Sequence, residues 1–472
     1  MRQLSISLIV AAALATAADR AQASGYRFGS QSVAAQGTAD ANGAEANDPS
    51  AIFYNPAGLA RLDGLQISLG ATVVLPRSRY TDLGSTHFTG QPAGGTETDD
   101  YLPDAVLAPS FYLSKKIDAR WTVGLGLFVP YGAKLDFGRT WTGRYALTDM
   151  KLESLALNPS ASFKLDERHA FGFGISAEHM NAALGQAVDV PGAIAALSTP
   201  AAVAQSAALV RQIAALGGNP TLLRTSADGH GSNDVKDWGW GYNLGYMWTL
   251  DADTRLGLSY RSSVVHKLRG STVWDFSTVT SDPIVNNVLA AASHRANSAA
   301  LVAIRTPETL SFDVFHQFTP RWAGMADLTW TRNNRLGNLN IEFPGTDEGA
   351  EVIRQQWKNT ARLSIGASYA YSAELTLRAG LAYDQSPVKA ALAHPALPDG
   401  DRKQISAGGK WKLDAHSSID FAYSYVDVRK VTVDYTNDCS PLNAGCTGNG
   451  ESTKGTFQTH VSLVGIAYNY QF

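Results

Sequence analysis

After Gly64 the sequence alternates between apolar and polar residues in many short segments, and the last twelve residues show this most clearly. Because side chains alternate across a strand with period 2, one face of this segment is wholly apolar and carries Val464, Ile466, Tyr468, Tyr470 and Phe472. As the edge of a soluble sheet such a strand would invite aggregation, whereas in a closed barrel it completes the wall and turns its apolar face to lipid. The pattern favours a membrane barrel over a soluble sandwich.

Fourteen segments of this kind follow Gly64, with lengths near those of strands that cross an outer membrane. We predict strands at 65–75, 105–115, 121–131, 150–164, 169–180, 238–250, 254–267, 306–317, 321–332, 359–371, 374–384, 402–413, 417–429 and 457–472. Tight connections such as 116–120, 251–253 and 414–416 alternate with long loops. An even strand number with short turns on one rim and long loops on the other is typical of bacterial barrels.

The two faces of the predicted strands differ in kind. Leu363 and Ile365 share one face of a strand, while Arg362 and Ser364 share the other. One apolar face in every strand favours lipid outside and a polar lumen inside. The sequence therefore predicts an all-β fold, a 14-stranded antiparallel transmembrane β-barrel, with Trp and Tyr near the strand ends as interfacial girdles.

The N-terminus has the form of an export signal. Arg2 supplies a positive charge, residues 4–18 are apolar, and Ala21-Gln22-Ala23 fits a cleavage site. We predict a cleaved signal peptide over 1–23, because the apolar run is too short to span a bilayer of about 30 Å. No later segment offers a membrane helix of about 20 apolar residues.

Composition excludes several other classes of function. Charged residues make up 17% of the chain and the formal net charge is −3, so no basic surface for nucleic acid is expected. The two cysteines, Cys439 and Cys446, lie in one loop and are expected to form a disulfide in an exported protein. No Cys or His residues are spaced as the ligands of a metal site, and no motif indicates a cofactor.

Two long loops have helical patterns, at 199–217 and 282–304. Each has an N-cap residue and a proline in its first turn (Thr199 and Pro200; Asp282 and Pro283). Each presents an apolar stripe, and these stripes contain Val203, Val210, Ile213, Ile284 and Val288. Two interpretations stay open: the helices pack on the barrel rim, or the stripes face each other as an apolar groove that captures a ligand.

A fourteen-stranded barrel is too wide for its wall side chains to fill, so a separate segment must block it. Residues 24–63 precede the first strand and contain Gly25-Tyr-Arg-Phe-Gly-Ser-Gln-Ser-Val33 and Tyr54-Asn-Pro-Ala-Gly-Leu59. This block resembles the mature N-terminus of the FadL family of outer-membrane hydrophobe transporters. Its family motif is carried here by Asn55, Pro56 and Ala57, followed by Gly58.

The resemblance implies a hatch at 24–63 inside a barrel at 64–472, with helical extracellular loops. It implies a monomer in the outer membrane of a Gram-negative bacterium, surrounded by lipid and lipopolysaccharide. The terminal Phe472 matches the signal for the barrel-assembly machinery. The implied function is passive uptake of long-chain fatty acids, or of aromatic or alkane hydrocarbons, by loop capture, lumen binding, hatch rearrangement and lateral diffusion through the wall.

In that family the third strand bends inward and opens the wall. Strand 121–131 meets Pro130, Tyr131 and Gly132 just after Phe128. Proline cannot donate to the ladder and glycine permits unusual backbone angles, so we expect pairing to break there. These four residues are the predicted lateral opening.

Four basic residues have the parity of lumen side chains: Arg261, Arg362, Arg378 and Lys410. They are candidate partners for a ligand carboxylate. Alternatively they pair with inward carboxylates, namely Asp313, Asp327, Asp384 and Asp420, as a structural ladder in the wall. An uncharged substrate would need no such cation.

Rival functions have weaker support in the sequence. A lipid hydrolase of the outer membrane needs a nucleophile with a histidine and an orienting group, and no recognisable nucleophile motif is present. We therefore expect no enzymatic activity. A hydrophilic porin would keep an open channel, which a packed hatch argues against, and the long loops leave room for a role in surface adhesion.

Overall fold

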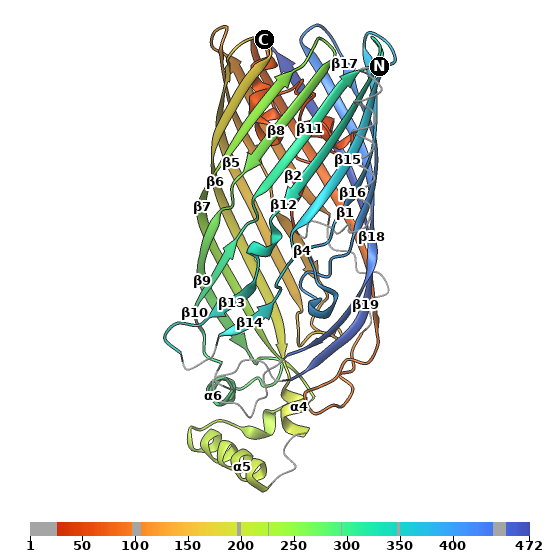
Figure 1. Ribbon diagram of the computed structural model, residues 1–472. Helices are drawn as coiled ribbons and strands as arrows, with labels where there is room; N and C mark the ends of the chain where they lie inside the picture. The colour runs from red at the N-terminus through yellow and green to blue at the C-terminus, as the bar shows by residue number, and fades with distance from the viewer. Residues whose placement is uncertain are drawn as a thin grey trace.

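The computed structural model describes residues 26–96, 105–195, 200–224, 226–293, 295–346, 350–437 and 450–472. The predicted signal peptide and both cysteines, Cys439 and Cys446, lie outside the described residues. The described strands form one closed antiparallel sheet that is drawn as a tall barrel in Figure 1. Tight turns lie at one rim (the short-turn rim, top of Figure 1), and the long loops lie at the other (the long-loop rim).

Nineteen strand segments make fourteen passes through the wall, because five passes are each broken into two segments. The segments are β1 (Leu65–Asp82), β2 (Val106–Lys116), β3 (Trp121–Phe128), β4 (Gly132–Asp136), β5 (Asp149–Lys164), β6 (His169–Val188), β7 (Gly229–Thr249), β8 (Thr254–Arg261), β9 (Val265–Asp275), β10 (Ser298–Arg305), β11 (Thr309–Gln317), β12 (Trp322–Thr331), β13 (Asn338–Glu342), β14 (Glu351–Arg354), β15 (Thr360–Ala370), β16 (Leu375–Asp384), β17 (Arg402–Lys412), β18 (Ser417–Thr436) and β19 (Ser452–Gln471). The predicted fourteen-stranded antiparallel barrel is thus confirmed.

The last strand closes the ring against the first. β1 and β19 are paired without interruption from Gln66 opposite Gln471 to Asp82 opposite Gly455. The backbone N–H of Phe472 also donates to the carbonyl of Leu65 at 2.9 Å. No wall edge is left unpaired at this seam, as the terminal pattern predicts.

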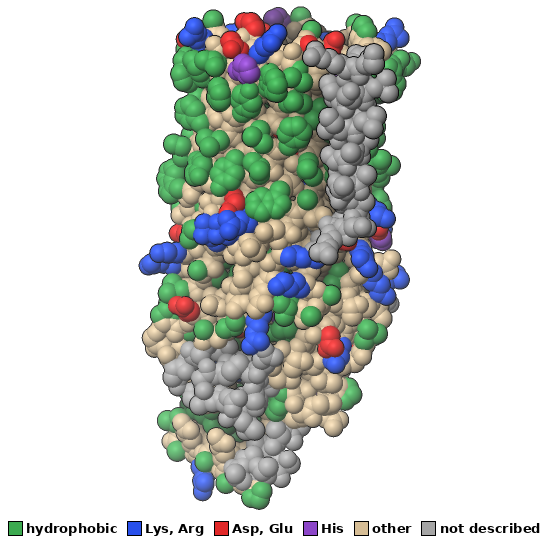
Figure 2. Space-filling view, viewed as in Figure 1, with side chains coloured by type: hydrophobic (Ala, Val, Ile, Leu, Met, Phe, Trp, Pro, Cys, Tyr) green, Lys and Arg blue, Asp and Glu red, His purple; other side chains and the backbone are tan. Residues whose placement is uncertain are grey.

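The alternation of faces is as the sequence predicts. In β19, Val464 and Ile466 are 48% and 61% exposed on the outside, whereas Leu463 is 6% exposed inside. The outward side chains form a nearly continuous apolar band next to the short-turn rim, shown in green in Figure 2. Beyond the band, β1, β6, β7, β18 and β19 continue farther than the pattern predicts, and carry the wall to the long-loop rim.

The loops hold the helices α4 (Val190–Ala195), α5 (Pro200–Ala215) and α6 (Pro283–Ala292), and the short 3-10 turns η2 (Pro220–Leu222), η3 (Asn333–Arg335) and η4 (Ala390–Leu392). The carboxylate of Asp282 caps α6 by accepting the N–H groups of Ile284 and Val285. Among the described residues, no helix has the length and apolarity to cross a bilayer.

The predicted helix over 282–304 is wrong beyond residue 292. Residues 298–305 form β10, with Ala300, Val302 and Ile304 buried on its inner face. An alanine-rich run satisfies helical spacing as easily as strand spacing, and here pairing with β9 decides the outcome. The hairpin of β13 and β14 is likewise absent from the predicted elements.

The N-terminal segment, residues 26–62, lies inside the barrel. It contains α2 (Val33–Gln36), α3 (Ala51–Tyr54) and η1 (Pro56–Arg61). Ser32 caps α2, and the side chain of Asn55 caps η1 by accepting the N–H of Ala57 at 3.1 Å. Most of the segment is buried, so it fills the lumen rather than hanging from the wall.

Wall glycines make room for the Asn55-Pro56-Ala57 turn. A Cβ atom at Gly172 of β6 would overlap the backbone of Pro56 and Ala57, and one at Gly245 of β7 would overlap the Asn55 side chain. The amide of Asn55 donates to the carbonyl of Tyr246 at 3.1 Å. The motif therefore fixes the segment against β6 and β7.

Candidate functional site

The third pass of the wall is interrupted between β3 and β4. On the β2 side, the ladder ends at Phe111 opposite Leu127, and β4 is paired with β5 alone. Residues 106–110 of β2 pair with β1, but no described strand pairs with their other edge. The wall therefore has a gap between β2 and β4.

The N-terminal segment takes up the hydrogen bonds that the third pass lacks. The N–H of Phe28 donates to the carbonyl of Pro130 at 3.0 Å, and the N–H of Gly132 donates to the carbonyl of Tyr26 at 3.1 Å. Pro130 contributes only an acceptor, which suits a position where no ladder donor is required. The buried ring of Tyr131 lies 5.3 Å from the ring of Tyr26, so the strand turns inward here.

The glycine at this break has a different role from the one expected. Gly132 is not among the residues with positive φ, and a Cβ atom there would meet nothing within 4 Å. Conformational freedom of glycine is therefore not what interrupts the strand. The interruption follows from Pro130, from the bulge between Phe128 and Gly132, and from pairing with residues 26–28.

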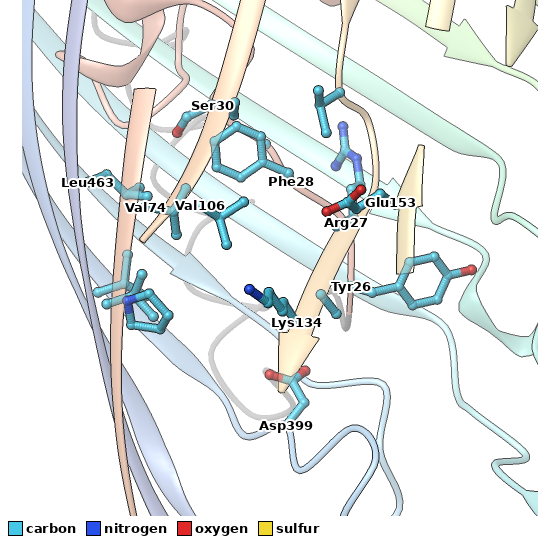
Figure 3. Close-up of a pocket in the computed structure, with 18 of the residues that line it drawn as sticks. Tyr26, Arg27, Phe28, Ser30, Val74, Val106, Lys134, Glu153, Asp399 and Leu463 are labelled. Atoms are coloured by element: carbon cyan, nitrogen blue, oxygen red, sulfur yellow. The ribbon is translucent and has the colours of Figure 1, made fainter. Parts of the chain in front are cut away.

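A cavity of about 610 Å³ leads from the lumen to this gap. Inward residues such as Val74, Val426 and Leu463 line it on one side, and Leu107 and Leu155, which face outward, line it on the other. Figure 3 shows Phe28, Val74, Val106 and Leu463 around the cavity, with Lys134 and Asp399 nearby. Because its lining includes both faces of the wall, the cavity reaches the outer surface of the barrel between β2 and β5.

Most cations that line the cavity are already engaged. Arg402 forms an ion pair with Asp399 at 2.8 Å, and Arg362 forms one with Asp40 at 3.0 Å. Arg27 differs: its guanidinium has no hydrogen bond or ion pair to another described residue, although it lines both this cavity and a smaller one behind the N-terminal segment. Sequence reasoning missed Arg27, even though it lies within the N-terminal block.

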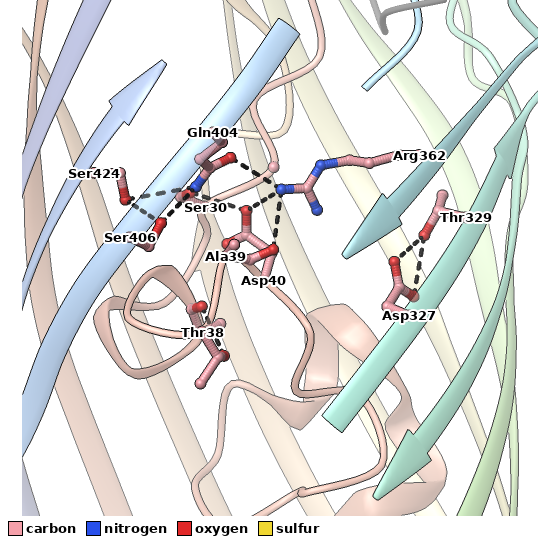
Figure 4. A network of polar contacts seen from close by, with 12 residues as sticks. Ser30, Thr38, Ala39, Asp40, Asp327, Thr329, Arg362, Gln404, Ser406 and Ser424 are labelled. Carbon is pink, nitrogen blue, oxygen red and sulfur yellow. Dashed lines mark hydrogen bonds and ion pairs between the residues drawn. The ribbon is translucent and has the colours of Figure 1, made fainter. Parts of the chain in front are cut away.

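Arg362 holds the N-terminal segment to β15, as Figure 4 shows. Its Nη2 atom donates to the carboxylate of Asp40, to the carbonyl of Ala39 and to Gln404, each at 3.0 Å. Ala39 and Asp40 have φ of 50° and 64°, a strained conformation that turns both acceptors toward the guanidinium. Of the four cations predicted for the lumen, Arg362 is the one that lines the cavity.

The other three predicted cations lie away from the cavity. Arg378 pairs with Glu45 of the N-terminal segment at 2.9 Å. Lys410 lies 3.9 Å from Asp420 of β18, a pair within the wall of the kind expected as the alternative. Arg261 donates to the carbonyl of Phe53 at 3.1 Å and stacks over that ring. Two of these three therefore bind the N-terminal segment rather than a wall carboxylate.

The two loop helices pack against each other. Ile213 of α5 and Val288 of α6 are buried in one cluster with Val285, and Ile284 lies beside them. One of the two interpretations was an open groove between the apolar stripes. In the structure these side chains fill the space between the two helices. Val203 and Val210 point elsewhere and are 51% and 43% exposed, so they remain available at the surface.

The loop between β16 and β17 covers the cavity from the long-loop side. Its residues 396–399 belong to the cavity lining. His394 is buried beneath them, 4.2 Å from the ring of Tyr435, and its Nδ1 accepts the N–H of Ala396 at 3.0 Å. Burial lowers the pKa of His394 to about 3, so the ring is neutral at physiological pH.

Comparison with known proteins finds relatives that match nearly the whole length of the chain. A family model described as outer membrane protein transport protein (OMPP1/FadL/TodX) matches residues 14–472. An outer membrane protein of Neisseria meningitidis serogroup B is 35% identical over 469 residues, which cover 97% of each chain. The long-chain fatty acid transport protein of Salmonella typhi is 25% identical over 427 residues, 90% of this chain and 92% of its own.

Solved structures share the fold. A FadL homologue from Pseudomonas aeruginosa superposes with a TM-score of 0.80 at 24% identity, covering 95% of this chain and 100% of its own. The toluene transporter TodX of P. putida superposes with a TM-score of 0.62 at 20% identity, covering 90% and 94%.

Breaking the buried pair at Arg362 should loosen the N-terminal segment. We expect Arg362→Met to lower the free energy of unfolding by about 3–5 kcal/mol, because it leaves the buried Asp40 carboxylate without a cation and with only the hydroxyl groups of Ser30 and Tyr54 as side-chain donors. Asp40→Asn combined with Arg362→Met should recover part of this loss. The measurement is urea unfolding in detergent micelles.

The matched control is Lys164→Met, which breaks the exposed pair with Glu167. It should cost less than about 1 kcal/mol. Equal stability of Arg362→Met and the wild type would contradict a structural role for the pair.

Acidification should open the loop over the cavity. In the unfolded chain His394 has a pKa near 6.5, whereas in the folded chain it is about 3. Protons therefore bind the unfolded state first, and loop stability falls by about 1.4 kcal/mol for each pH unit below 6.5, until pH 3. Above pH 6.5 no loss is expected.

Proteolysis of residues 385–401 across this pH range measures the effect. His394→Gln cannot titrate, so its cleavage rate should not rise as the pH falls from 6.5. A wild-type rate that follows the variant at every pH would disprove the coupling.

Proposed function

The chain belongs to the OMPP1/FadL/TodX family of outer membrane transport proteins, and from this membership we propose that it takes up long-chain fatty acids by lateral diffusion through its wall. As a member of that family it is an outer-membrane transporter of hydrophobic compounds. The proposal concerns the substrate and the route. No enzymatic step is part of it.

The observation that carries the proposal is the continuity of the cavity with the gap between β2 and β4. A hydrophobic chain has no reason to cross a water-filled pore, but it gains about 25 cal/mol for each Å² of apolar surface it buries. The lining includes Val74, Val426 and Leu463 inside and Leu107 and Leu155 at the gap, so apolar side chains are present at both ends of the route. The outward end of that route meets lipid.

Arg27 supports a fatty acid over an uncharged hydrocarbon. A carboxylate in an apolar cavity needs a cation, and the guanidinium of Arg27 has none of its donors bound to another described residue. The pairing of residues 26–28 with 130–132 holds this arginine beside the interruption between β3 and β4, which supports this role. A ligand head group at Arg27 therefore lies next to the predicted exit residues, Phe128, Pro130, Tyr131 and Gly132.

The proposed sequence of steps uses the parts already described. The exposed Val203 and Val210 of α5 capture the substrate, which then enters the cavity. The N-terminal segment acts as the hatch, with Asn55, Pro56, Ala57 and Gly58 holding it on β6 and β7, and it shifts to free the route. The substrate leaves through the gap, and its concentration gradient is the only driving force.

A second candidate is uptake of aromatic or alkane hydrocarbons by the same route. Its support is the fold shared with the toluene transporter TodX. The two candidates differ in whether the cavity must bind a carboxylate. Arg27 is therefore the residue that separates them.

Filling the wall side of the cavity should stop transport. Ala108 lines the cavity from β2, so Ala108→Trp should reduce uptake of a radiolabelled long-chain fatty acid to the level of cells that lack the protein. Ala379→Trp places the same side chain on the lipid-facing side of β16 and should transport normally. Normal uptake by Ala108→Trp would exclude this route.

Neutralising Arg27 should identify the substrate class. We expect Arg27→Gln to weaken fatty-acid binding by about tenfold through loss of a charge-assisted hydrogen bond, and to leave toluene uptake unchanged. Equal effects on both compounds, or uptake of toluene alone by the wild type, would favour the hydrocarbon candidate. Quantitative binding by the purified protein in detergent and uptake in cells give the two readouts.

A further inference from the structure

Four basic side chains gather on the outer wall of three neighbouring strand segments. Lys236 lies on β7, Lys267 and Arg269 on β9, and Arg305 on β10, and all four are exposed. Lys236 is directly opposite Arg269, while Lys267 and Arg269 are two residues apart on one face, about 7 Å. Arg305 pairs with Val265, next to Lys267 on that face. We call these four residues the basic patch.

The basic patch has too few carboxylates within reach to balance it. No ion pair joins any of its four side chains to a described carboxylate, and Arg305 instead donates to Ser263 at 3.1 Å. Three carboxylates are near. Glu342 of β13 is exposed and opposite Leu301, which is in turn opposite Arg269. Asp234 is opposite Ser271 at the edge of the patch, and Asp237 accepts the backbone N–H of Lys267 at 2.7 Å. Like charges directly opposite each other destabilise a sheet. A bound anion between Lys236 and Arg269 would therefore reduce their repulsion.

Two other basic residues of the outer surface are neutralised within the chain. Lys151 pairs with Glu153 at 2.9 Å, and Arg332 pairs with Glu308 at 3.0 Å. The basic patch differs from these pairs because it brings four basic side chains together on three neighbouring strand segments.

The patch lies where the apolar band of the wall ends. Trp238 and Trp240 follow Lys236 on the outer face of β7 and are 60% and 70% exposed. On β9, Val265 lies next to Lys267 on the outer face, on the side of the short-turn rim, and is 51% exposed. Figure 2 shows Lys and Arg side chains at this boundary on the face in view. The basic patch thus lies next to an apolar surface that acyl chains of a lipid can contact.

We propose that the basic patch binds the phosphate groups of a phosphorylated glycolipid in the outer leaflet, with the acyl chains of that lipid against Trp238 and Trp240. The chemistry is that of basic clusters at a membrane surface, where each Lys or Arg attracts anionic head groups. The exposed apolar surface of Trp238 and Trp240 favours a lipid over a free anion. This inference does not depend on what the protein transports.

The test titrates the purified full-length protein in neutral detergent with three probes: lipopolysaccharide, the same lipid after enzymatic removal of its phosphates, and inorganic phosphate. K236Q/K267Q/R269Q should bind intact lipopolysaccharide about 100-fold more weakly than the wild type. Both proteins should bind the dephosphorylated lipid equally. The control R120Q/R168Q/R321Q removes three exposed cations from the short-turn rim and should bind intact lipopolysaccharide like the wild type.

Thermal unfolding gives a second readout that a purely structural role would not produce. In detergent alone the variant K236Q/K267Q/R269Q should be at least as stable as the wild type, because repulsion between Lys236 and Arg269 is gone. With lipopolysaccharide added, the wild type should become the more stable of the two.

Three results would overturn the proposal: equal stabilisation of both proteins by lipopolysaccharide, an equal loss of binding in the control, or equal binding of the intact and dephosphorylated lipid by the wild type. Inorganic phosphate that stabilises the wild type as well as lipopolysaccharide does would show that the patch is a simple anion site.

Discussion

A wall in lipid has no water to satisfy its backbone, and this constraint governs the whole molecule. Fourteen passes must close into a ring, so β1 is paired with β19 along its length. A ring of this size leaves a wide lumen, and the N-terminal segment fills it. Where the ring is broken between β3 and β4, that same segment supplies the missing partners through Tyr26 and Phe28. The closed ring, the filled lumen and the pairing of residues 26–28 at the interruption all follow from this one constraint.

The passes of the wall could be predicted from the sequence because their pattern is local. Period-2 alternation over about ten residues marks a strand whether or not its partner is known, and all fourteen passes lie at predicted positions. What local pattern does not give is length beyond the lipid band. Outside the band the apolar side chains lie on the inner face, for example Met180 of β6 and Val433 of β18. The lipid-facing pattern is therefore lost where β6 continues to Val188 and β18 to Thr436.

The contacts of the candidate site were harder to predict, since they join residues far apart in the chain. Arg362 has the parity of a lumen residue, which its sequence position shows, but its partner Asp40 is 322 residues away in an irregular segment. Asp40 accepts this bond from a positive-φ conformation that no sequence rule predicts for aspartate followed by alanine. Arg27 was missed for a related reason: it lies on no regular element, and only pairing with 130–132 brings it beside the interruption between β3 and β4.

The N-terminal segment also acts as a cross-link between distant parts of the wall. The side chain of Gln36 donates to the carbonyl of Leu463, 427 residues along the chain, while Asn55 is bound to β7. The segment therefore joins the last strand to the middle of the barrel through the lumen. Such a link reduces the conformational freedom of a wall whose closure is otherwise non-local. Any movement of the segment out of the lumen has to break bonds to both strands.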